Sequence, residues 1–188
     1  MFVICGKTAS GKDTIANKLE EIGYERIVTY TTRPPRPGEV ADKAYHFISE
    51  EQFEEKIRNM DFLEYRAFDT EFGRWYYGSE VSELDMFDDK TFIILSPSGV
   101  KALLDKCGAS TPEIIYIYAN TKTIQTRLVE RGDSTEESIR RLYQDNIDFR
   151  NMPDIANRII YNNLNDNIDD VVDQITYYLR KRKERKNA

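Results

Sequence analysis

The stretch FVICGKTASGK, residues 2–12, decides the fold, because an apolar run leads directly into a glycine-rich turn. The turn has the spacing G-x-x-x-x-G-K, in which glycines let backbone N–H groups converge on phosphate oxygens and a lysine adds positive charge. An ordinary glycine-containing turn is the alternative. The flanks favour a phosphate loop, since residues 2–5 are typical of a buried strand and residues 14–22 (TIANKLEEI) have apolar residues at helical spacing. The predicted phosphate-binding residues are Gly6, Ala9, Ser10, Gly11, Lys12, Asp13 and Thr14.

The rest of the chain alternates apolar runs with helical patterns. The expected strands are 2–5, 91–95, 113–118 and 158–161, and the expected helices are 14–22, 100–106, 121–131, 135–150 and 166–183. This order predicts an α/β fold with a parallel sheet flanked by helices. Residues 31–82 break the rhythm with short β-like pieces at 45–48, 62–68 and 72–77 and a helix near 50–58, which predicts an inserted α+β subdomain.

Length and charge limit the function classes. A chain of 188 residues forms one domain with room for an insertion, and its net charge of −6 argues against a nucleic-acid partner. The basic run at residues 180–186 (RKRKERK) is the exception. We interpret it as a solvated helix end that complements the helix dipole, with a nucleic-acid or membrane patch as the alternative.

Two cysteines, Cys5 and Cys107, are far apart in the sequence, which argues against a disulfide framework or a metal site. The sequence has no apolar stretch of membrane-spanning length and no signal peptide, so we expect a cytoplasmic protein without membrane contact.

A second anion site is indicated by TTRPPRPGE, residues 31–39. Arg33 and Arg36 lie three positions apart in a chain that prolines stiffen, and the planar guanidinium group suits bidentate contact with phosphate. From spacing alone, a proline-rich surface turn with solvated arginines is an equal alternative.

The order of motifs resembles the guanylate kinases over nearly the whole chain. The shared features are the phosphate loop, T-T-R-x-P-R-x-G-E, the stretch DKAYHF at 42–47, Glu64, and WYYGS at 75–79. The resemblance implies a P-loop kinase core at 1–30 and 83–188, a monophosphate-binding subdomain at about 31–82 and a small helical lid at about 127–141. It further implies ATP with Mg²⁺ as phosphoryl donor and GMP as acceptor.

The resemblance also implies individual roles. The positions matching Arg33, Arg36, Tyr45 and Tyr77 hold the GMP phosphate, and those matching Glu64 and Ser79 hydrogen-bond the guanine. In the lid, positions matching Arg127, Arg131 and Arg141 act with Lys12 on the ATP phosphates. The position matching Asn162 lies near adenine. For Arg140 we expect solvent exposure.

The chemistry of Glu64 agrees with its implied role. Guanine presents an N1–H and an N2 amino group side by side, and one carboxylate can accept from both, whereas the N1 of adenine is an acceptor. A surface charge on a strand is the alternative for Glu64, and packed core aromatics are the alternative for Tyr45 and Tyr77. His46 is interpreted as a packing residue without a catalytic role.

Two positions depart from the family pattern. Asp13 stands where Ser or Thr follows the loop lysine, and Ser96 stands where the guanylate kinases carry an acid near the guanine and the metal. We hypothesise that the changes compensate, with Asp13 bringing a carboxylate to the magnesium shell from the loop side. Loss of the acid at Ser96 makes acceptance of dGMP or another monophosphate plausible.

The sequence therefore predicts an ATP-dependent kinase of GMP or dGMP. A broader-specificity (deoxy)nucleoside monophosphate kinase is the nearest alternative. A non-catalytic guanylate-kinase-like binding module is a further one, although such modules typically lose the phosphate loop. Either a monomer or a homodimer is compatible with the sequence.

Overall fold

The computed structural model describes residues 1–36, 38–43, 45–70, 72–80, 89–107 and 111–186. The predicted end of the inserted subdomain, near residue 82, lies outside this part. The chain divides into two compact units. The first unit comprises Met1–Val3 and Arg26–Pro112, and the second unit comprises Ile4–Glu25 and Glu113–Ala188.

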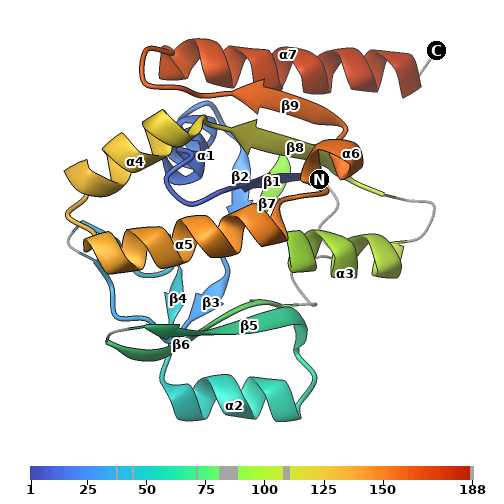
Figure 1. The fold of residues 1–188 in the computed structure, drawn as a ribbon. Helices are drawn as coiled ribbons and strands as arrows, with labels where there is room; N and C mark the ends of the chain where they lie inside the picture. The colour runs from blue at the N-terminus through green and yellow to red at the C-terminus, as the bar shows by residue number, and fades with distance from the viewer. Residues whose placement is uncertain (37, 44, 71, 81–88, 108–110, 187–188) are drawn as a thin grey trace. The chain divides into compact units, whose positions relative to one another are not determined.

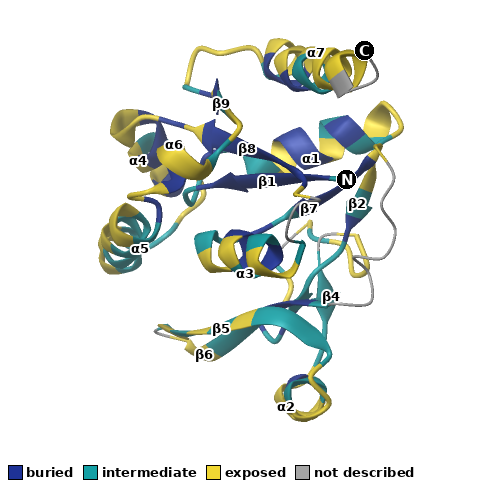
Figure 2. Ribbon diagram, turned by 90° about the vertical axis from the view of Figure 1, so that its right-hand side faces the viewer, coloured by how far each residue is buried: buried dark blue, intermediate teal, exposed yellow. Residues whose placement is uncertain are grey.

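A five-stranded sheet has the strand order β2-β7-β1-β8-β9. Its strands are β1 (Phe2–Gly6), β2 (Glu25–Ile27), β7 (Thr91–Ile94), β8 (Glu113–Tyr118) and β9 (Arg158–Tyr161). Strands β8 and β9 pair in parallel, with Tyr116 opposite Ile159. Figure 2 shows β1 as buried along its whole length, as its apolar run requires. The predicted fold class, a parallel sheet with flanking helices plus a second sheet, is confirmed.

The helices of the second unit are α1 (Lys12–Glu21), α4 (Thr121–Glu130), α5 (Thr135–Asp148), α6 (Met152–Ile155) and α7 (Ile168–Lys186). Helix α1 packs against α7, which runs along β9 (Figure 1). Ser134 is the N-cap of α5, since its side chain accepts from the Glu137 N–H. Helix α1 begins two residues before the expected Thr14, because Gly11 adopts the left-handed conformation and ends the loop there.

The first unit contains a four-stranded sheet of order β4-β3-β6-β5. Its elements are β3 (Tyr30–Thr31), β4 (His46–Phe47), α2 (Glu50–Arg58), β5 (Phe62–Thr70), β6 (Gly73–Glu80) and α3 (Pro97–Cys107). The ring of Phe53 on α2 stacks on Phe62 and also packs against Tyr76, which joins the helix to this sheet. Helix α3 packs against β5.

Short elements are the main differences from the sequence expectation. Strands β2 and β3 and the four-residue helix α6 were not predicted, because they are too short to show periodicity. Helix α3 begins at Pro97 rather than at residue 100, since proline suits the first turn and Ser96 Oγ accepts from the Gly99 N–H at 3.1 Å. No helix in the described ranges is long and apolar enough to cross a membrane.

Candidate functional site

The phosphate loop of the second unit connects β1 to α1, and its two glycines are sterically required. A Cβ at Gly6 would lie 2.7 Å from the Ile117 carbonyl oxygen, closer than real side chains approach. At Gly11, where φ is +91°, a Cβ would collide with the Asn162 amide. The motif spacing therefore reflects close backbone packing as well as the turn itself.

Lys12 lies at the start of α1 with its ammonium group folded back over the loop. Its Nζ donates to the Lys7 carbonyl oxygen at 2.8 Å. Burial lowers the pKa of Lys12, while Asp13 and Asp145 favour the charged form. The loop thus holds a positive group beside its own backbone without a direct ion-pair partner among the described residues.

Two side chains contact the phosphate loop: Arg127 on α4, and Asn162, which directly follows β9. Arg127 Nη1 donates to the Ala9 carbonyl oxygen at 3.2 Å, and Asn162 Nδ2 donates to the Ser10 carbonyl oxygen at 2.8 Å. Buried Ala119, Ile124 and Leu128 pack against Ala9, which positions α4 beside the loop. The two predicted residues are therefore fixed to the loop backbone.

A pocket of about 320 Å³ lies between these elements of the second unit. Its lining residues are Ala9, Gly11, Lys12, Asp13, Thr14, Arg127, Arg131, Asn162, Asp166 and Ile168. Three cationic side chains and an amide thus share one cavity with the loop, which suits a polyphosphate. Asp166, which the sequence did not single out, lines the same cavity.

The remaining predicted lid residue, Arg141 on α5, does not line this pocket. Its guanidinium contacts Glu137 at 2.6 Å and Asp133 at 3.4 Å, and Asp133 also accepts from Arg131 at 2.8 Å. Arg140, expected in solvent, keeps 38% of its side chain exposed and pairs with Glu137 at 2.7 Å along the helix surface. These contacts lower the pKa of Glu137, with Arg140 the leading cause. Asp133 thus engages both Arg131 and Arg141, and Glu137 engages Arg140 and Arg141.

Helix α5 also contacts the phosphate loop through two residues that the sequence did not indicate. The Thr8 N–H donates to Asp145 Oδ2 at 2.6 Å, and Lys7 Nζ donates to Asn146 Oδ1 at 2.6 Å. Burial raises the pKa of Asp145, and Lys12 and Lys7 oppose this shift. Asp145 lies one helical turn after Arg141, so the contact also sets the position of that arginine.

The phosphate-loop pocket offers oxygen donors of the kind that magnesium prefers. Mg²⁺ is typically held by one or two carboxylates together with substrate phosphates and water. Asp13, Thr14 and Asp166 all line the pocket, so the donor set fits. No group of three or more His, Cys, Asp or Glu residues that could hold a metal ion occurs in the described part of the chain.

In the first unit, Arg33 is almost fully buried, with 3% of its surface exposed. Its Nη2 contacts Glu39 Oε1 at 2.9 Å, and its guanidinium lies 5.7 Å from the centroid of the Tyr45 ring. Burial works against its charge, but Tyr77, Glu39 and Tyr45 together raise its pKa. Within the described residues, Arg33 Nε is a buried atom without a hydrogen-bond partner. Such an orphaned donor is suited to an anionic ligand.

The two predicted tyrosines lie beside this arginine. The rings of Tyr45 and Tyr77 meet edge to face, with centroids 6.0 Å apart. Arg36 is half-buried, and its backbone N–H donates to Glu39 Oε2 at 2.7 Å. Glu39 therefore orders the arginine turn by accepting from both arginines, although Arg36 uses only its main chain in this contact. The ring of His46 is tilted against that of Tyr30, with centroids 4.6 Å apart, and its Nδ1 lies 2.7 Å from Asp42 Oδ1.

Glu64 on β5 is surrounded by hydroxyl groups. Ser79 Oγ donates to Oε1 at 3.2 Å, and Ser98 Oγ donates to Oε2 at 3.5 Å. Ser96 Oγ lies 2.9 Å from Ser98 Oγ, so the position where the family carries an acid is joined to Glu64 through a second serine. Burial raises the pKa of Glu64, against the opposing effect of Ser79. Ser98 was not identified from the sequence.

The fold and these two sites define the class of P-loop nucleotide kinases: a glycine-tight phosphate loop with converging cations, and a separate arginine–tyrosine and carboxylate site. The guanylate kinase family model matches residues 1–182. The chain is 30% identical to guanylate kinase of Clostridium tetani, over 93% of this chain and 82% of that protein. It is 32% identical to guanylate kinase of Clostridium perfringens, over 93% and 80% of the two chains.

A solved structure supports the fold. The crystal structure of guanylate kinase from Anaplasma phagocytophilum superposes with a TM-score of 0.66 at 23% identity, covering 97% of this chain and 85% of that chain. Because the family model matches nearly the whole chain, this chain belongs to the guanylate kinase family.

Proposed function

We propose that this chain transfers the γ-phosphoryl group of ATP to GMP, giving ADP and GDP. The observation that carries the proposal is the set of cations around the phosphate loop, where Lys12, Arg127 and Arg131 line one pocket. Phosphoryl transfer asks mainly for alignment and for positive charge around the moving group. Membership in the guanylate kinase family supports the choice of nucleotides.

In this proposal, residues 127–141 act as the lid and residues 31–82 form the monophosphate-binding subdomain. The lid arginines Arg131 and Arg141 leave Asp133 and Glu137 when ATP phosphates compete for them.

The phosphate of GMP is held by Arg33, Arg36, Tyr45 and Tyr77, and the unpaired Nε of Arg33 supports this role. Glu64 accepts from guanine N1–H and N2, with Ser79 holding its other lone pairs. Asn162 lies on the adenine side.

Mg²⁺, when bound with ATP, neutralises phosphate charge. Asp13 would hold it from the loop side, with Asp166 as the other carboxylate of the pocket. The side chains themselves bind and orient the phosphates, and closing the site excludes water that would otherwise hydrolyse ATP.

The test is a product assay with ATP, Mg²⁺ and GMP. Chromatographic separation is expected to show GDP and ADP formed in equal amounts, with far less ADP when GMP is omitted. ADP formed at the same rate without GMP would indicate an ATPase and contradict the proposal.

A second candidate, a broader-specificity nucleoside monophosphate kinase, is favoured by one observation. The hydroxyl group of Ser96, rather than a carboxylate, lies near Glu64 and is joined to it through Ser98. A hydroxyl forms a weaker hydrogen bond with the guanine amino group than a carboxylate does. Discrimination between guanine and other bases is therefore weaker, and monophosphates with other bases are proposed as further acceptors beside GMP and dGMP, which share the guanine base.

Asp13→Ser is expected to raise the Mg²⁺ concentration needed for half-maximal turnover by about 10-fold, because the pocket loses a carboxylate that contacts the metal or its waters. Turnover is measured against free Mg²⁺ at saturating ATP and GMP. Asp154→Ser, an exposed position on α6, is the control and leaves the curve unchanged. An unchanged curve for Asp13→Ser would remove Asp13 from the proposed metal shell.

Asp145→Ala is expected to lower kcat/KM for ATP by about 10- to 100-fold, because a hydrogen bond to a charged group contributes about 1.5–3 kcal/mol. Asp145→Asn keeps an oxygen for the Thr8 N–H and recovers most of this loss, whereas Asp154→Ala has no effect. Steady-state kinetics with varied ATP provide the measurement. If Asn were as damaging as Ala, the charge rather than the contact with Thr8 would be responsible.

A further inference from the structure

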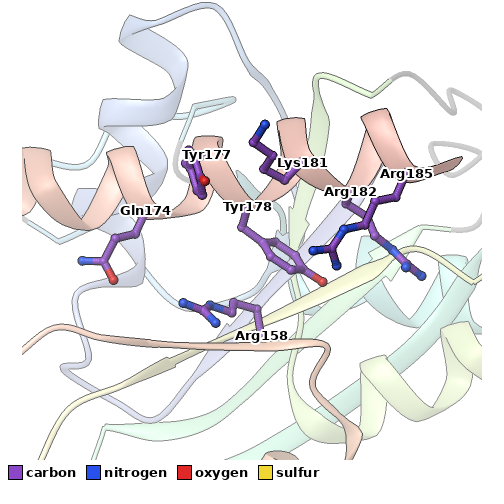
Figure 3. Close-up of a pocket in the computed structure, with 7 residues that line it drawn as sticks. All are labelled: Arg158, Gln174, Tyr177, Tyr178, Lys181, Arg182 and Arg185. Carbon is purple, nitrogen blue, oxygen red and sulfur yellow. The ribbon is translucent and has the colours of Figure 1, made fainter. Parts of the chain in front are cut away.

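A second pocket of the second unit lies between α7 and β9, apart from the phosphate-loop pocket. Its volume is about 520 Å³ (Figure 3). The lining residues are Arg158, Gln174, Tyr177, Tyr178, Lys181, Arg182 and Arg185. None of them lines the phosphate-loop pocket, so this cavity is not part of the proposed catalytic site.

The lining carries four cationic side chains and no acidic one, although the whole chain has a net charge of −6. Arg182 is paired with Glu113 at 2.8 Å, and Lys181 is paired with Glu184 at 2.8 Å. Arg158 and Arg185 have no ion-pair partner among the described residues. The cavity therefore retains positive charge that suits an anion.

A buried carboxylate orders one wall of this pocket. Glu113, which is 8% exposed, accepts from the Tyr178 hydroxyl at 2.7 Å and from Arg182 Nε at 2.8 Å. This bond uses only Nε, so the two Nη groups of Arg182 are available for a ligand. Figure 3 shows Tyr178 reaching from α7 toward β9, with Arg158 and Arg182 on either side of its ring.

An aromatic surface accompanies the charges. Tyr177 is 57% exposed, and two cations lie near its ring: the guanidinium of Arg180, which does not line the pocket, at 5.5 Å from the centroid, and the ammonium of Lys181 at 6.0 Å. Exposed aromatic rings beside guanidinium groups are a common platform for nucleobases, which stack on them with little sequence preference.

The helix dipole explains only part of this arrangement. Basic residues at the end of α7 complement the negative C-terminal end of the helix, but Arg158 belongs to β9 and completes the pocket from a different element. A surface that binds single-stranded RNA would need an extended basic groove that follows the sugar-phosphate backbone of the RNA. Here the charge is gathered in one cavity of ligand size.

We propose that this pocket binds a nucleoside di- or triphosphate at a site separate from the phosphate loop, with the phosphates on Arg158, Arg182 and Arg185 and the base against Tyr177. The ligand would contact the beginning of β9, whose last residue directly precedes Asn162. Asn162 Nδ2 donates to the Ser10 carbonyl oxygen, so a nucleotide bound in this pocket is placed to influence the phosphate loop through β9.

The test uses the full chain labelled with ¹⁵N and GTP as the probe. Amide resonances of residues 174–185 and 158–161 are expected to shift on titration, and their midpoint gives the affinity of this pocket separately from the loop. Arg158→Gln with Arg185→Gln weakens this affinity by about 10-fold or more, because two charge-assisted contacts are lost. The matched control is Lys122→Gln with Arg150→Gln, which removes two exposed charges of the same unit outside the pocket. It is expected to change the affinity for GTP by less than about 2-fold, because salt screens charges that do not contact the ligand.

Two further probes identify the ligand class. Inorganic tripolyphosphate is expected to bind about 5-fold or more weakly than GTP, and Tyr177→Ala reduces GTP binding to that level, because base stacking is lost. Arg185→Gln alone, at an exposed helix position, tests the pocket if the double variant does not fold, with an expected loss of about 3-fold.

Absence of shifts on α7 and β9, or equal loss in the pocket variant and its control, would overturn the proposal. Tripolyphosphate binding as tightly as GTP would overturn the role of the base. A ten-residue oligouridine binding more tightly than GTP would identify the surface as a polynucleotide site instead. None of these outcomes depends on whether the phosphate loop catalyses transfer to GMP.

Discussion

Replacing Lys12 with methionine is expected to lower kcat for ATP and GMP by about 10³-fold or more, since a positive side chain that stabilises the transferred phosphoryl group has an effect of this size in related reactions. Methionine keeps the unbranched apolar part of the side chain but cannot supply the ammonium that lies over the loop. The rate of GDP formation at saturating substrates is the measurement. Lys18→Met serves as the control, because that lysine of α1 lies on the surface, paired with Glu21 and Asp169.

The same variant separates an enzyme from a binding module. A non-catalytic module would show no ATP affinity to lose, whereas we expect the wild type to bind ATP and Lys12→Met to bind it more weakly. Calorimetric titration of both proteins decides between these outcomes. Full turnover in the Lys12→Met variant would remove the phosphate loop from the chemistry.

Replacing Glu64 with alanine is expected to lower kcat/KM for GMP by about 10²-fold, through the loss of two hydrogen bonds from guanine to a charged acceptor. The slow rate with AMP, whose base cannot donate from N1, changes little. Steady-state kinetics with both monophosphates provide the comparison. Glu54→Ala, an exposed residue of α2 in the same unit, is the control. Equal losses for GMP and AMP would indicate a structural role for Glu64.

A pH profile gives an independent check on the same residue. Burial raises the pKa of Glu64, so its protonated form accumulates at a higher pH than it would for an ordinary glutamate. A protonated carboxyl cannot accept from both guanine donors, and therefore kcat/KM for GMP falls as the pH is lowered through this pKa. Glu64→Gln removes this limb of the profile because the amide does not titrate in that range.

The features predictable from sequence were those encoded by local spacing. The glycines at positions 6 and 11 indicated the loop before their contacts with Ile117 and Asn162 were visible, and alternation of apolar runs with helical patterns indicated the parallel sheet. Ser134 could be identified as a cap because an N-cap and its partner lie three residues apart.

The features that could not be predicted depend on distant packing. Asp145 meets Thr8 across 137 positions, and no local pattern distinguishes it from other acids on the polar face of α5. Ser98 reaches Glu64 only because α3 packs against β5, where a Cβ at Gly99 would lie 3.1 Å from the Glu64 carboxylate. The strands β2 and β3 are stabilised by pairing with their neighbours rather than by their own sequences.

The most direct measurement of the central claim is the kcat/KM of the wild-type protein for GMP, dGMP, AMP, CMP and UMP with ATP and Mg²⁺. The account predicts that GMP is the best acceptor, that dGMP is used with some loss, and that AMP and the pyrimidine nucleotides are poor acceptors. AMP phosphorylated as efficiently as GMP would contradict the assignment of Glu64 to guanine and, with it, the proposed function.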